Sequence, residues 1–269
     1  MDFFDWINTA DIFNFSNIFW NMIMELVGII ASATPQEFSN MAWYYTKVLI
    51  MNWTLTIGSS LFSTFYLINM LRQTANLKQG ITAERFIEIS ITVILGNYAM
   101  IYGIQLINLI FDITGTISEA FMLDSRPTFN TLTPGDSSIF IFLLAFFYIV
   151  VSLVCGFMIL YVVYSRYLNL YLLVGVGPIA WSTIPGGHGI SSTATAWLKS
   201  FLAKSFEIVI IVFAINIASR MCNAINLGAL TGAGAISGEI QMINNMLTMI
   251  ILTGSIKGAE MFMHRTFGL

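Results

Sequence analysis

Long runs without a charged side chain constrain the fold of this sequence more than any other feature. Residues 48–71, 89–111 and 139–165 contain no Asp, Glu, Lys or Arg. About 20 largely apolar residues make a helix long enough to cross the roughly 30 Å hydrocarbon core of a bilayer. We therefore expect a membrane-spanning helix in each of these runs, and two shorter ones at about 205–221 and 240–256.

The composition agrees with this expectation. Only 9% of the 269 residues are charged and 57% are hydrophobic, whereas soluble domains carry roughly 25% charged residues. So few charges cannot cover the surface of a soluble domain, and a net charge of −3 does not suit a nucleic-acid-binding surface. We expect an all-α polytopic integral membrane protein, with residues 1–269 forming a single membrane domain.

Residues 167–186 leave the topology open. They are apolar but contain Gly175, Gly177 and Pro178, so they could form a sixth span or a re-entrant hairpin broken at these residues. Basic residues gather on the cytoplasmic side of membrane proteins. If the chain begins outside and residues 167–186 form a hairpin, three basic residues lie outside the membrane, namely Lys47, Arg126 and Arg220. Eight then lie on the cytoplasmic side, namely Arg72, Lys78, Arg85, Arg166, Lys199, Lys204, Lys257 and Arg265.

A full span at 167–186 would instead leave five basic residues on the cytoplasmic side and six outside. We therefore expect five spans and a re-entrant hairpin. The protein would be a multi-pass protein of the cell membrane, with its N-terminus outside and its C-terminus in the cytoplasm.

The N-terminal 35 residues contain a polar stripe at helical spacing, formed by Asn14, Asn17, Asn21, Glu25, Gly28 and Ser32. Residues 12–33 could cross the membrane, but Glu25 would then lie at mid-bilayer at a cost of a few kcal/mol. We expect residues 1–35 to form an extracytoplasmic amphipathic helix at the membrane interface, which Thr34 and Pro35 terminate.

No arrangement of residues indicates catalysis. The two histidines, His188 and His264, lack a carboxylate cluster beside them, and no nucleophile elbow or phosphate-binding loop is present. We therefore expect that the protein is not an enzyme and has neither a cofactor nor a metal site. The glycine-rich residues 227–238 predict an outside loop.

Polar side chains follow one face of each of the first two spans. The first face carries Ser59 and Ser63 with Asn52, Thr56 and Ser60, and the second carries Asn97 and Asn108 with Gln105 and Asp112. Such faces either pack against each other or line a passage. The third span is filled with aromatic residues, Tyr148 among them, and should face lipid. Glu207 follows Lys204 by three residues, which predicts an ion pair near the cytoplasmic interface.

The region around the third and fourth spans resembles a known family. It contains Arg166-Tyr167-Leu168-Asn169-Leu170, then Val176-Gly177-Pro178-Ile179-Ala180, then Trp197-Leu198-Lys199-Ser200-Phe201-Leu202-Ala203-Lys204. This order resembles the TrbL-like polytopic subunit of conjugative type IV secretion systems, in particular its short Gram-positive versions. The resemblance in motif covers residues 160–205.

The resemblance implies a channel or scaffold subunit that helps a DNA–protein substrate across the cell membrane. Its implied partners are other copies of itself, other membrane subunits and cytoplasmic ATPases, with the nucleoprotein bound only transiently. We expect the 167–186 hairpin to form a wedge rimmed by Arg166, Lys199 and Lys204, where partners meet the channel. The alternative function is a small-solute or ion transporter with a broken-helix site near Pro178.

Overall fold

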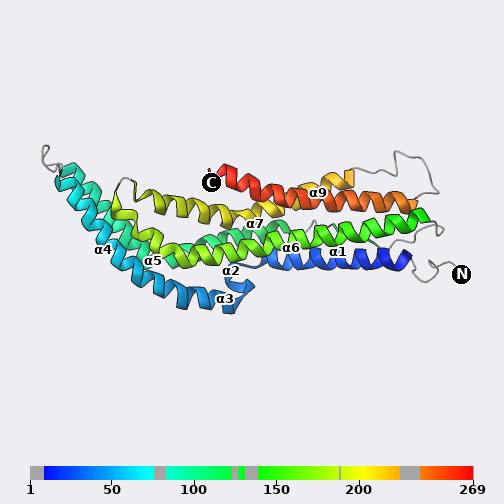
Figure 1. Cartoon of the computed structure of the whole chain (residues 1–269), viewed down its shortest axis with the longest axis horizontal. Coiled ribbons are helices and arrows are strands. Elements are labelled where there is room, and N and C mark those ends of the chain that lie inside the picture. Colours follow the sequence, from blue (N-terminus) through cyan, green and yellow to red (C-terminus); the bar gives the residue numbers. More distant parts are fainter. Residues whose placement is uncertain are drawn as a thin grey trace. The chain divides into compact units, whose positions relative to one another are not determined.

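The computed structural model describes residues 9–75, 83–122, 127–130, 139–187, 189–224 and 237–268. All elements within these ranges are helical. They are α1 (Thr9–Ser32), α2 (Pro35–Phe38), α3 (Asn40–Tyr44), the π-helix η1 (Tyr45–Ile50), α4 (Met51–Ala75), α5 (Ala83–Met122), α6 (Ile139–Ser182), the 3-10 helix η2 (Ile184–Gly186), α7 (Ser192–Ala224) and α9 (Ser237–Thr266) (Figure 1). Six helical segments in these ranges are long and apolar enough to cross a membrane. The predicted all-α polytopic fold class is confirmed.

The chain forms two compact units. Unit 1 comprises Met1–Ala33, Gly115–Ser165 and Glu207–Met263, and unit 2 comprises Thr34–Thr114, Arg166–Phe206 and His264–Leu269. The helices α5, α6, α7 and α9 each contribute residues to both units. The sequence analysis divided the chain nowhere, because no linker or composition change marks these boundaries.

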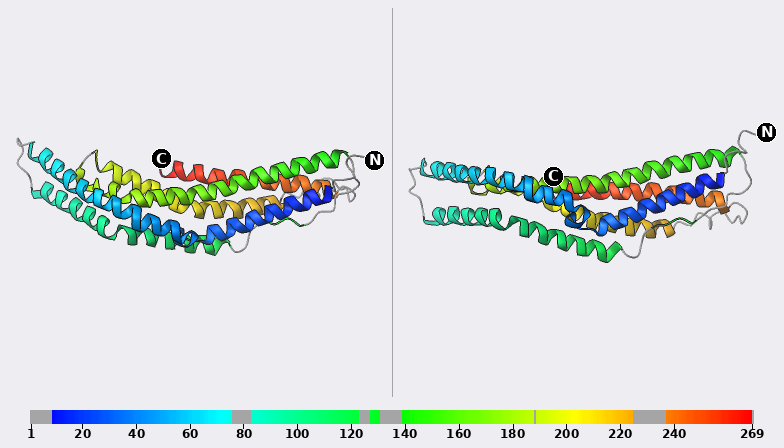
Figure 2. Two further views of the ribbon diagram at one scale, coloured as in Figure 1. Left: turned by 60° about the horizontal axis from the view of Figure 1, so that its bottom comes forward. Right: turned by 90° about the horizontal axis from the view of Figure 1, so that it is seen from below.

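In unit 1, α1 runs parallel to the first part of α6. Phe13 contacts the ring of Tyr148, the hydroxyl of Ser152 donates to the carbonyl of Ser16 at 3.2 Å, and Phe19 contacts Phe157. Figures 1 and 2 show these two segments along each other, with α9 beside them. In these contacts the residue numbers of both helices rise together, so both helices begin at the same end of unit 1.

The polar stripe of α1 faces protein. The amides of Asn17 and Asn21 donate to the carbonyls of Asn130 and Phe129, both at 2.9 Å, and the indole of Trp20 donates to Pro127 at 3.2 Å. Asn17 is 2% exposed, whereas Glu25 is exposed. The helix and its end at Thr34–Pro35 are as predicted, with Thr34 and Glu37 forming a capping box. Two residues of the stripe, Asn17 and Asn21, bind residues 127–130, because amide side chains satisfy the backbone groups of that segment.

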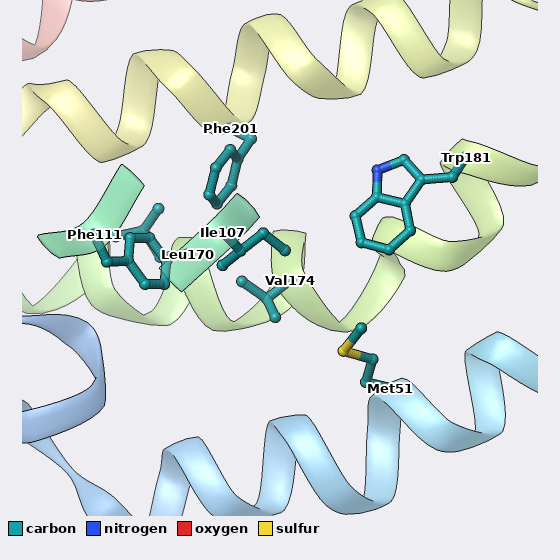
Figure 3. Packing of buried hydrophobic residues seen from close by; sticks show 7 residues of the cluster. All are labelled: Met51, Ile107, Phe111, Leu170, Val174, Trp181 and Phe201. Atoms are coloured by element: carbon teal, nitrogen blue, oxygen red, sulfur yellow. The ribbon is translucent and has the colours of Figure 1, made fainter. Parts of the chain in front are cut away.

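The core of unit 2 joins four helices. Figure 3 shows its buried cluster, which consists of Met51 from α4, Ile107 and Phe111 from α5, Leu170, Val174 and Trp181 from α6, and Phe201 from α7. The rings of Phe111 and Phe201 lie 5.6 Å apart between centroids. In this unit α4 to α7 therefore share one apolar core.

The predicted break in 167–186 is wrong. The helix α6 continues without interruption from Ile139 to Ser182 with Pro178 inside it, and the chain turns only afterwards, between Thr183 and Ser191. Two helices extend beyond the predicted spans: α7 begins at Ser192 where the predicted span begins at 205, and α9 continues to Thr266 where the predicted span ends at 256. Polar residues extend these helices past the apolar runs because helix continuation needs no apolar side chain.

Some predictions lie outside the described residues. These are the loop at 227–238, except for the start of α9, the turn residue His188, and the basic residues Lys78 and Arg126.

Candidate functional site

The second part of α6 and the first part of α7 form a helical hairpin, which is the site that the sequence singled out. Its tip comprises residues 183–187 and 189–191, where the backbone nitrogen of Gly186 donates to Thr183 and that of Ser191 to Gly187. Gly187 has a φ of +74°, a conformation that glycine adopts without strain. The amide of Asn69, at the end of α4, donates to the carbonyl of Pro185 at 2.8 Å. The tip is therefore fixed to the C-terminal end of α4.

Pro178 lies where α4 and α6 are in close contact. A Cβ added at Gly58 of α4 would lie 2.7 Å from the carbonyl oxygen of Pro178, so only glycine fits there. The hydroxyl of Thr54 donates to the carbonyl of Gly175 at 2.7 Å. On α4, Gly58 thus allows close contact with the carbonyl of Pro178, and Thr54 binds the carbonyl of Gly175 on the turn before it.

Donors from neighbouring helices bind the backbone of α6 on the turn that precedes Pro178. A proline removes one backbone N–H and displaces the carbonyl four residues earlier. The indole of Trp197 on α7 donates to the carbonyl of Leu173 at 2.8 Å, on the turn that precedes the proline, and Thr54 serves the carbonyl of Gly175 there. The carbonyl that loses its helical donor to Pro178 is that of Val174, and these two bonds fix the carbonyls before and after it to α7 and α4.

Gly177 lies between two tryptophans. A Cβ at this position would lie 3.2 Å from both Trp181 and Trp197, whose rings meet edge to face at 5.3 Å. Trp197 also stacks on Phe201 at 5.3 Å. The sequence predicted a break in the helix at Gly177 and Pro178, but the packing around them is tight and aromatic.

The predicted basic rim of the hairpin is only partly formed. Arg166 is 1% exposed, and its Nε and Nη2 donate to the carbonyls of Lys204 and Ser205 at 3.1 and 3.4 Å. Lys204 is 8% exposed, whereas Lys199 is exposed. The prediction that Arg166 and Lys204 lie at a solvated interface is wrong, because the carbonyls of α7 give the guanidinium buried acceptors. Glu207 is buried as well, at 1% exposed, rather than directed to the interface.

The polar face of α4 is exposed along its whole length. Ser59 and Ser63 are exposed, as are Asn52, Thr56 and Ser60. The hydroxyls of Ser59 and Ser63 donate to the carbonyls four residues earlier, at 2.7 and 3.3 Å. Within the described part of the chain, this face packs against no other helix, so the interpretation as intramolecular packing is wrong.

The polar face of α5 is similar. Asn97, Gln105 and Asp112 are exposed, and Asn108 is half-buried. The Oδ1 atom of Asn108 is buried and has no hydrogen-bond partner among the described residues.

Three residues of unit 1 form a polar network that the sequence analysis missed. The hydroxyl of Tyr148 on α6 donates to Oδ1 of Asn17 on α1, and Asn245 on α9 donates to Tyr148 at 3.4 Å. Tyr148 is fully buried, which contradicts its predicted lipid-facing position. The signal was Asn245, an amide inside an apolar helix that requires a partner.

The described residues hold no group of three or more His, Cys, Asp or Glu side chains that could bind a metal ion. Comparisons with models of protein families, with curated proteins and with solved structures found no match to this chain.

Proposed function

We propose that the chain is a channel or scaffold subunit of a conjugative type IV secretion system. In this role it helps a DNA–protein substrate across the cell membrane and performs no chemistry of its own. The proposal combines the resemblance of residues 160–205 with one structural observation, the exposed polar faces of α4 and α5.

These faces belong to helices that the chain itself leaves uncovered. In the most apolar windows of the two helical segments that contain α4 and α5, 11% and 17% of residues are buried, against 61% for α7. A row of Ser, Thr and Asn facing hydrocarbon is unfavourable, whereas small polar residues promote close helix association and hydrogen bonding between helices. The faces therefore suit contact with another copy or another membrane subunit, or the wall of a water-filled passage.

The remaining basic side chains support the same role. Lys199 and Arg72 are exposed in unit 2, on α7 and at the end of α4. Positive charge there suits acidic surfaces of cytoplasmic ATPases or the phosphates of a passing nucleoprotein.

The geometry does not favour the alternative, a transporter with a broken-helix site near Pro178. The helix is not broken, and Gly58 leaves no room beside the Pro178 carbonyl. We do not pursue it.

The test is a mating assay in which donor cells carry the chain with Ser59→Leu and Ser63→Leu. Leucine blocks close approach of a partner helix without adding a charge, so we expect oligomers on native gels to be lost. Transfer should fall by about tenfold or more, while membrane abundance stays unchanged. The matched control is Ser59→Ala with Ser63→Ala, which keeps both positions small and should retain assembly and transfer.

If the leucine variant transferred DNA at the wild-type rate, the polar face of α4 would no longer support the proposed function. Normal transfer from a donor that lacks this chain would overturn the proposed function itself.

A further inference from the structure

A polar cavity of about 480 Å³ lies in unit 2 at the tip of the α6–α7 hairpin. The C-terminal end of α4, the start of α5 and the hairpin tip surround it. Its polar side chains are Asn69, Arg72, Gln73, Glu88, Thr92 and Ser191. Among the described residues it thus contains one positive and one negative group, which suits a ligand that carries both charges.

Gln73 offers this cavity an acceptor. Its Nε2 donates to Oδ1 of Asn69 at 3.3 Å, which fixes the orientation of the amide. Its Oε1 is buried and has no hydrogen-bond partner among the described residues. A buried carbonyl oxygen without a donor is costly. A ligand with N–H groups would satisfy it.

A second, apolar groove of about 390 Å³ lies next to this cavity in the same unit. The side chains that form it include Ala99, Ile107, Trp181, Ala194, Trp197 and Phe201. Figure 3 shows three of them, Ile107, Trp181 and Phe201, within the core cluster. The groove suits a hydrocarbon chain.

The two hollows are neighbours. Ile184 lines both of them. Along α5, Glu88 and Thr92 border the polar cavity, and Ala99 to Ile110 border the groove. Eleven residues of helix measure about 16 Å, close to the roughly 15 Å of one leaflet of a 30 Å hydrocarbon core. The polar cavity followed by the apolar groove therefore matches a phospholipid, in which a polar headgroup is followed by an acyl chain about one leaflet long.

We propose that unit 2 binds a phospholipid with an ethanolamine headgroup, with the headgroup in the polar cavity and an acyl chain in the apolar groove. The guanidinium of Arg72 binds the phosphate, for which its planar pair of donors is well suited. The ammonium group donates to the carboxylate of Glu88 and to Oε1 of Gln73. This inference does not depend on the secretion role.

The charges distinguish ethanolamine from other headgroups. A headgroup with only negative charge would meet the carboxylate of Glu88 without a compensating cation. A choline headgroup has the positive charge but no N–H group for Gln73. The site should therefore prefer phosphatidylethanolamine to both phosphatidylglycerol and phosphatidylcholine.

The first experiment measures headgroup preference on the full chain, purified in detergent and stripped of lipid. Each of the three phospholipids is added, and retained lipid per chain is measured by native mass spectrometry. Phosphatidylethanolamine should be retained most, and Arg72→Gln should lower its retention by about tenfold, the effect of one charge-assisted hydrogen bond. Glu88→Gln should abolish the preference for ethanolamine over glycerol. Lys47→Gln, at an exposed basic residue of unit 2 that lines neither hollow, should leave lipid retention unchanged.

The second experiment tests the groove with a matched pair on α7. Ala194 lines the groove, whereas Ala196, two residues later, is exposed and outside it. Ala194→Phe should fill the groove and prevent retention of the lipid, while Ala196→Phe should retain it like the wild type. Because Arg72 and Glu88 are exposed, their variants keep the test informative if Ala194→Phe fails to fold.

Three outcomes would overturn the proposal. Equal retention of all three lipids would mean that the chain holds ordinary surrounding lipid. Stabilisation by free phosphoethanolamine as strong as by the lipid would assign the cavity to a soluble phosphate ester. Loss of a dimer, with unchanged lipid, in Ala194→Phe would assign the groove to a second copy of the chain.

Discussion

At the scale of single residues, glycine positions determine where helices of this protein can touch. Gly58 faces the backbone of Pro178 at a distance that excludes a Cβ, whereas Gly254 on α9 has no atom within 4 Å of such a position. Both lie inside helices. The two glycines therefore separate the effect of helix propensity from that of close packing.

We expect opposite effects of alanine at these two positions. Gly254→Ala should stabilise the protein by about 0.5–1 kcal/mol, because alanine favours the helix. Gly58→Ala should destabilise it by about 1–3 kcal/mol, because the backbone of Pro178 must move. Thermal unfolding in the same detergent measures both changes. Equal stabilisation of the two variants would contradict the close approach of α4 to α6.

The sequence predicted which polar residues share a helix face, but not whether each residue is buried or exposed. The polar faces with Ser59, Ser63, Asn97 and Asn108 were identified by spacing, but spacing cannot tell whether a face lies against the protein or points away from it. The burial of Arg166 was not predictable either. It depends on carbonyls of α7 that lie almost 40 residues further along the chain.

At the scale of elements, the sequence located the apolar runs and the end of α1, and failed at Pro178. The rule that proline ends a helix holds for a helix considered alone. Here Thr54 and Trp197 donate to the carbonyls of Gly175 and Leu173 on the adjacent turn. Both donors belong to other helices, so only the tertiary structure shows how this turn of α6 is held.

The continuous α6 leads to a prediction for Pro178→Ala. Alanine restores a backbone donor to a helix that already exists, so the free energy of unfolding should rise by about 1–3 kcal/mol. The topology should not change, and a cysteine at Ser192 should react with an impermeant maleimide as in the parent. Trp197→Phe, which removes the donor to Leu173, should instead lower stability by about 1 kcal/mol. A changed reactivity at position 192 after Pro178→Ala would show that the proline does determine the topology.

At the scale of the whole molecule, the packing of unit 1 bears on the side of the membrane at which the chain begins. The segment 127–130 has irregular backbone, and the side chains of Asn17, Trp20 and Asn21 bind it. Irregular backbone occurs at membrane depth only where protein or water surrounds it. The first part of α1 and residues 127–130 therefore share one environment and must lie on the same side of the membrane, which the basic residues of the sequence predict to be the outside.

Cysteines at Asp11 and Asn130, both exposed, test this arrangement. The native Cys155 and Cys222 are buried and are replaced by alanine, so that only the new thiols react. In right-side-out vesicles, an impermeant maleimide should label both positions before the membrane is opened, and a cysteine at the exposed Glu84 of α5 serves as the comparison site. If only one of the two positions reacted, α1 and residues 127–130 could not pack as they do here. If both reacted only after opening, unit 1 would keep its structure, but the N-terminus would lie in the cytoplasm and the prediction from the basic residues would be wrong.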